Sequence, residues 1–125
     1  VYIDLKGCAG EREVAAVLMR SRASAAVHAF DHELILRIRR LMPQLRTGIL
    51  QSSRLVDSAG ALRAAEATDL WQWHEFVDRA LVEQVTAAGG RVIAWTANAE
   101  SEWRTFDDYG VAGICTDMPG APKFA

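Results

Sequence analysis

The stretch at residues 91–119 reads RVIAWTANAESEWRTFDDYGVAGICTDMP, and its pattern decides the fold class. A short apolar run at residues 91–95 is followed by a polar exit at 96–98. A helical pattern covers residues 99–109, and a second apolar run covers 111–116. Two strands joined by a crossover helix are parallel, so the polar residues after both strands lie at one edge of the sheet. The stretch therefore predicts a βαβ unit of a barrel or of a doubly wound sheet.

The rest of the chain repeats this alternation of strand and helix patterns. Further strands are expected at residues 1–5, 25–30, 46–50 and 69–74, and helices at 11–20, 32–41, 60–67 and 76–88. Asp31 is the type of residue that caps a helix N-terminus, and it precedes the second helix. Regular alternation of this kind predicts one mostly parallel sheet.

Composition narrows the class of protein. The chain has 125 residues, enough for one domain, and 50% of them are hydrophobic. The net charge of −2 and the presence of only two lysines argue against a nucleic-acid partner. No apolar run approaches the ~20 residues of a membrane helix. Neither phosphate-binding glycine motif, G-x-G-x-x-G or the Walker pattern, is present, which weakens a nucleotide-binding function.

The two cysteines, Cys8 and Cys115, fit no metal-binding spacing, and we expect buried free thiols rather than a disulfide. The chain begins at Val1 inside an apolar run, so we expect a further segment upstream. Asp4 lies within that first apolar run. A carboxylate in a strand costs free energy unless it is paired or bound to a metal, which marks Asp4 as a candidate ligand.

Three separated segments resemble one family, the glycerophosphodiester phosphodiesterases, which are TIM barrels. They are IDLK at residues 3–6, VHAFD at 27–31, and AWTAN at 94–98 together with GVAGICTDMP at 110–119. AWTAN is similar to the family's W-T-x-N strand end, and GVAGICTDMP is similar to its closing G-V-D-G-I-x-T-D-x-P. These two stretches are the most specific part of the resemblance. The resemblance runs through nearly the whole chain in order. It implies that residues 1–125 are the C-terminal part of a (β/α)₈ barrel, from about the fourth strand onward.

The resemblance also implies a chemistry. The family hydrolyses glycerophosphodiesters, which are small molecules, to glycerol 3-phosphate and an alcohol, with a divalent cation, Mg²⁺ or Ca²⁺, on the phosphoryl oxygens. Asp4 stands where the family has a glutamate that binds this metal. Lys6, on the same face of the strand, would neutralise a phosphate oxygen or pair with a carboxylate, or it would be a solvated lysine. Phe30 and Trp95 would line the substrate pocket, and both also fit ordinary core positions.

Several residues depart from the family pattern. Asp4 replaces glutamate, Ala29 replaces a serine, and Ala112 replaces an aspartate. The family's H-R-G and E-x-D segments and its second histidine have no counterpart, so no catalytic residue is assigned here and the chain alone is expected to be inactive. The three histidines share no metal-ligand spacing and are not assigned to catalysis.

Two other functions stay open. The departures favour a non-catalytic binding or assembly module derived from a barrel, and a related phosphodiesterase could instead act on phospholipid head groups. Asn98 and Asp117 are expected to hold loops rather than to take part in chemistry.

The chain has six candidate strands. An eight-stranded barrel with three strands upstream of this chain would leave only five, and residues 69–74 fit a strand least well. An open barrel edge also predicts self-association.

Overall fold

The computed structural model describes residues 1–7 and 10–120. This part of the chain contains six strands, five α-helices and one 3₁₀ helix in regular alternation. The strands are β1 (Tyr2–Asp4), β2 (Ala26–Ala29), β3 (Arg46–Gln51), β4 (Asp69–Trp73), β5 (Arg91–Trp95) and β6 (Gly113–Ile114). The helices are α1 (Glu11–Arg20), α2 (His32–Leu41), α3 (Ser58–Ala64), η1 (His74–Phe76), α4 (Arg79–Ala87) and α5 (Glu100–Tyr109).

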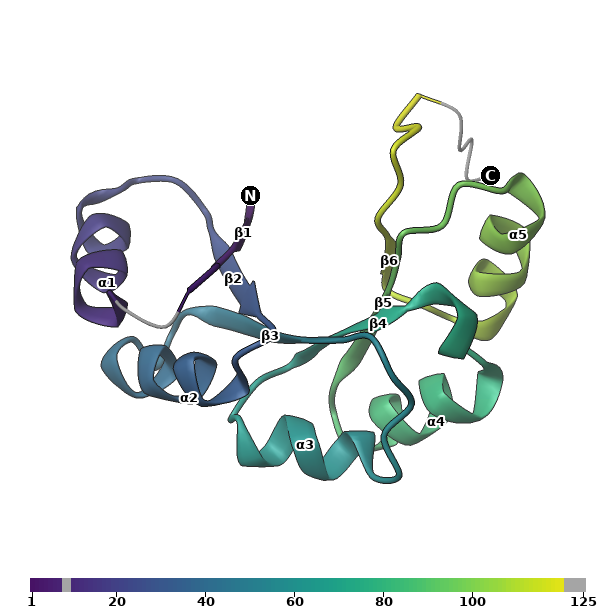
Figure 1. Cartoon of the computed structure of the whole chain (residues 1–125), viewed down its shortest axis with the longest axis horizontal. Coiled ribbons are helices and arrows are strands. Elements are labelled where there is room, and N and C mark those ends of the chain that lie inside the picture. Colours follow the sequence, from purple (N-terminus) through teal and green to yellow (C-terminus); the bar gives the residue numbers. More distant parts are fainter. Residues whose placement is uncertain (8–9, 121–125) are drawn as a thin grey trace.

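The six strands form one parallel sheet in the order β1-β2-β3-β4-β5-β6. Figure 1 shows the sheet as an open arc, with all five α-helices on its convex side and the two ends of the chain on opposite arms. This arrangement confirms the expected partial (β/α)₈ barrel. The view of residues 69–74 as the poorest strand was wrong, because β4 pairs with both β3 and β5 at the centre of the sheet.

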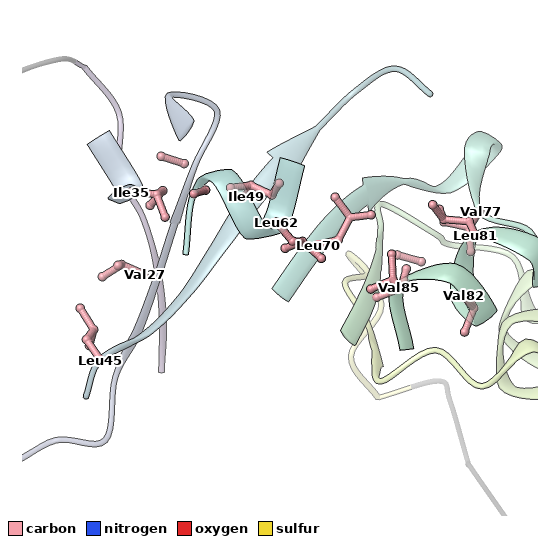
Figure 2. Close-up of a cluster of buried hydrophobic side chains, with 14 of the residues drawn as sticks. Val27, Ile35, Leu45, Ile49, Leu62, Leu70, Val77, Leu81, Val82 and Val85 are labelled. Carbon is pink, nitrogen blue, oxygen red and sulfur yellow. The ribbon is translucent and has the colours of Figure 1, made fainter. Parts of the chain in front are cut away.

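The core lies between the convex face of the sheet and the helices. Side chains from alternate strand positions point into it, and Val27, Ile49 and Leu70 have no exposed surface. Figure 2 shows these residues facing Ile35 of α2, Leu62 of α3 and the apolar side of α4. One buried cluster therefore joins sheet and helices, and the opposite, concave face of the sheet is left for other roles.

Helix starts follow capping side chains more closely than the apolar pattern indicated. Asp57 accepts a hydrogen bond from the Gly60 backbone at 2.7 Å, so α3 begins at Ser58 rather than at residue 60. Asp78 accepts from the Leu81 backbone at 2.8 Å, so α4 begins at Arg79 and residues 74–76 form the separate η1. The last strand, β6, has only two residues instead of six. No helix in the described ranges is long and apolar enough to cross a membrane.

A buried ion pair ties three strands together at the N-terminal edge of the sheet. The Asp69 carboxylate accepts hydrogen bonds from Arg91 Nε at 2.9 Å and Arg91 Nη2 at 2.8 Å. The Tyr2 hydroxyl lies 3.4 Å from Asp69 Oδ2 and 3.1 Å from Arg91 Nη2. Because Tyr2 comes from β1 and its partners from β4 and β5, this contact spans the concave face.

Candidate functional site at the C-terminal ends of the strands

The concave face carries the side chains that alternate with the core residues. In a (β/α)₈ barrel the C-terminal ends of the strands carry the site, so the residues that matter are the last inward-facing ones. At this edge lie Asp4 of β1, Phe30 just after β2, Trp73 of β4 and Trp95 of β5. The rings of Phe30, Trp73 and Trp95 are in contact with one another there, in the order Phe30–Trp95–Trp73.

Asp4 and Lys6 form an ion pair at the end of β1. Lys6 Nζ lies 3.1 Å from Asp4 Oδ2, and the side chains are 81% and 35% exposed respectively. The pair supplies the partner that a strand carboxylate requires, and it leaves Asp4 within reach of solvent. Residues 1–7 and 10–120 contain no group of three His, Cys, Asp or Glu side chains placed to hold a metal ion. Asp4 therefore offers one hard oxygen ligand and not a complete cation site.

Phe30 and Trp95 meet across the concave face. Their ring centroids are 5.7 Å apart at an interplanar angle of 78°. Trp95 is oriented by its own hydrogen bond, since Nε1 donates to the Trp71 carbonyl oxygen at 2.8 Å. Phe30 is 54% exposed, so it is not a core residue. Phe30 follows β2 and Trp95 ends β5. These two strands are not neighbours in the sheet, so only its curvature brings the two rings together.

Trp73 is a third aromatic residue at this edge that the sequence reasoning missed. It is the direct register partner of Trp95 on the neighbouring strand, and the two ring centroids are 5.1 Å apart at 81°. The alternation Trp71-Gln72-Trp73 was the available signal, because a true strand here places both tryptophans on one face. Because residues 69–74 were ranked as the poorest strand, the shared face of the two tryptophans was not predicted.

The three histidines do not meet. His28 lies on the concave face with its ring 4.2 Å from that of Trp71, and burial lowers the pKa of His28, against the opposing pull of Asp4 and Asp69. His32 Nε2 lies 2.9 Å from the Leu50 carbonyl oxygen. His74, directly after β4, has Nδ1 at 2.5 Å from Glu102 Oε1 of α5. This last contact was not expected from the sequence, because 28 residues separate its partners.

Two loops that follow β5 and β6 are joined by Asn98 and Asp117. Asn98 Nδ2 donates to Asp117 Oδ2 at 3.0 Å, and Asn98 Oδ1 accepts from the Asp117 backbone at 2.9 Å. The expected loop-holding role of both residues is confirmed. Cys115 is an exposed free thiol, so the expectation of burial was wrong for it: it follows β6, a two-residue strand at the edge of the sheet. Cys8 lies outside the described residues.

Comparison with known proteins supports the family resemblance described for the sequence. A model of the glycerophosphoryl diester phosphodiesterase family matches residues 5–121. A glycerophosphoryl diester phosphodiesterase structure from Silicibacter pomeroyi aligns at 29% identity and a TM-score of 0.80, over 88% of this chain and 40% of that one. A phosphodiesterase from Oleispira antarctica, in complex with the product sn-glycerol-3-phosphate, aligns at 25% identity and a TM-score of 0.81, over 93% and 50% of the two chains. No curated protein matches the chain.

The fold alone is also shared with a structure from Galdieria sulphuraria, at 16% identity and a TM-score of 0.83 over 94% of this chain and 53% of that one. The fold and the family match thus define a partial (β/α)₈ barrel of the phosphodiesterase type. The chain belongs to the glycerophosphoryl diester phosphodiesterase family. It spans about half, or less, of the length of the three structures to which it is similar.

Proposed function

We propose that this chain is the C-terminal part of a glycerophosphodiester phosphodiesterase domain and forms one wall of its substrate site. The complete domain would hydrolyse glycerophosphodiesters to glycerol 3-phosphate and an alcohol. One observation carries the proposal. In a half-barrel of this family, the Lys6 ammonium and the aromatic pair Phe30–Trp95 lie at the same edge of the sheet, the one that holds the C-terminal ends of the strands. If β6 is the eighth strand of the complete barrel, the six strands make β1 the third. The sequence suggested that β1 is the fourth.

Each strand-end residue has a proposed role. Lys6 would donate hydrogen bonds from its exposed ammonium to a phosphoryl oxygen, and Phe30 and Trp95 would pack against the carbon skeleton of the substrate. A divalent cation, Mg²⁺ or Ca²⁺, would supply charge neutralisation when bound. The exposed Asp4 carboxylate fits as one of its ligands, and the remaining ligands and the acid/base groups would come from the rest of the domain.

The test compares the complete domain with the 125-residue chain, using release of glycerol 3-phosphate from a glycerophosphodiester. We expect release only by the complete domain, and its loss with a chelator. Lys6→Met should lower kcat/KM about 10- to 100-fold, the value of a hydrogen bond to a charged group. Arg22→Met, which removes a cation from the loop before β2 at the opposite edge of the sheet, is the matched control.

Three outcomes would contradict parts of this proposal. Hydrolysis by the 125-residue chain would show that the acid/base groups are already present in it. No metal-dependent release from the complete domain would leave the non-catalytic barrel module as the explanation. Preference for intact phospholipids in a substrate panel would favour the phosphodiesterase that acts on head groups. The open edges at β1 and β6 should also cause self-association of the isolated chain, and a clean monomer on sizing would contradict that expectation.

A further inference from the structure

The structure assigns a role to Trp73 and to the pair His74–Glu102 beside it. We propose that Trp73 is a third aromatic residue of the substrate site, packing against the carbon skeleton of the glycerophosphodiester, and that the His74–Glu102 pair holds its ring against Trp95. The substrate part of this inference rests on the proposed function, whereas the holding part does not.

Trp73 has the placement of a wall residue. It is the last residue of β4, at the edge where a barrel carries its site, and it is only partly buried. Its ring stands nearly perpendicular to that of Trp95, which itself stands nearly perpendicular to Phe30. Three rings in this order make an angular apolar surface, and aromatic faces of this kind bind the C–H bonds of a ligand.

Trp73 differs from Trp95 in how its ring is held. Trp95 and Trp103 each donate an indole hydrogen bond to a backbone carbonyl at 2.8 Å. Within the described residues, the Trp73 indole N–H has no such acceptor and is not fully enclosed. The orientation of Trp73 therefore depends on the rings that contact it, which are Trp95 at 5.1 Å and His74 at 4.9 Å.

His74 is itself fixed by Glu102. One oxygen of the Glu102 carboxylate lies 2.5 Å from His74 Nδ1, and the other accepts from the Ala99 backbone at 3.2 Å. Both side chains are mostly covered, at 21% and 29% exposed. His74 directly follows Trp73, and Glu102 lies in the first turn of the helix that follows Trp95. The pair thus joins the two loops that carry the two tryptophans, and it acts as a positioning pair for Trp73.

The experiment follows indole N–H signals of the full natural chain by ¹H–¹⁵N NMR, with the Trp73 signal identified by its loss in Trp73→Phe. Without any ligand, Glu102→Gln and His74→Phe should shift the Trp73 signal. Glu100→Gln, which removes an exposed carboxylate from the same helix turn, should leave it in place. A Trp73 signal unmoved by both pair variants would overturn the positioning role. Unchanged far-ultraviolet circular dichroism checks that the variants are folded, and near-ultraviolet circular dichroism gives a second reading of the coupled Trp73–Trp95 rings.

The ligand arm uses sn-glycerol 3-phosphate, glycerol and inorganic phosphate as probes. We expect sn-glycerol 3-phosphate to shift both Trp73 and Trp95, inorganic phosphate to leave Trp73 unshifted, and the buried Trp103 to respond to none. Trp73→Ala should weaken sn-glycerol 3-phosphate binding about two- to tenfold, the range of one aromatic contact. If sn-glycerol 3-phosphate shifts the Trp95 signal and leaves the Trp73 signal in place, the substrate-site role of Trp73 is overturned and that of Trp95 is not. Silence of both tryptophans would overturn the proposed substrate wall, with the positioning role still judged by the first arm.

Discussion

Replacing Asp69 by Asn tests whether the buried ion pair at the N-terminal edge stabilises the half-barrel. The substitution keeps the size of the side chain and removes its charge. The Asp69 side chain is 1% exposed and accepts two hydrogen bonds from Arg91. The hydrogen bonds to Asp69 raise the pKa of Arg91. A guanidinium is protonated even without such a partner, so Arg91 stays charged after the substitution and loses its counter-ion.

The size of the effect follows from what is left behind. Removing one partner of a buried ion pair costs about 3–5 kcal/mol. The Arg91 side chain is 36% exposed, so water can rehydrate part of the stranded charge. We therefore expect the lower end, about 3 kcal/mol in the free energy of unfolding, which corresponds to a fall in Tm of roughly 10 °C for a domain of this size.

Urea denaturation followed by tryptophan fluorescence measures this change, with an unchanged m-value as the check that the same surface unfolds. The matched control is Glu100→Gln, which removes one member of the exposed Glu100–Arg104 pair and should cost almost nothing. A loss below about 1 kcal/mol for Asp69→Asn would refute the reasoning, because it would mean that the pair is no more than a solvated contact.

Three further predictions concern single positions. Because burial lowers the pKa of His28 below 6.5, the unfolded chain binds more protons near that pH; the free energy of unfolding should fall from pH ~7.5 to ~5.5, and His28→Gln should abolish that fall in urea titrations. A Cβ at Gly48 would lie 3.0 Å from the Asp69 carbonyl oxygen, so Gly48→Ala should cost about 1–3 kcal/mol, whereas Gly113→Ala, with nothing nearer than 3.8 Å, should not. Asp31 accepts a hydrogen bond from the Leu34 backbone at 3.0 Å and so caps α2. Asp31→Ala should cost about 1 kcal/mol in the free energy of unfolding and so lower Tm in a thermal melt, and an unchanged Tm would contradict the capping role.

The order and type of the elements were predictable because local rules govern them. Short apolar runs predicted strands and apolar residues at helical spacing predicted helices, so all six strands were expected at nearly their true places. The errors in helix boundaries fell where a single side chain decides where a helix begins. Asp57 and Asp78 set the first turns of α3 and α4 through hydrogen bonds that the apolar pattern does not record.

The strand and helix patterns of the sequence predicted a mostly parallel sheet, because such patterns depend on local residue spacing. The partial barrel and the strand-end roles of Lys6, Phe30 and Trp95 were implied by the family resemblance. Parallel strands then carry such residues to one edge of the sheet. Only the tertiary structure decided which of them touch. The curvature of the sheet brings Phe30, just after β2, against Trp95 of β5, and loop packing brings His74 to Glu102. These contacts join segments far apart in the chain, and no periodicity in the sequence encodes the distance between them.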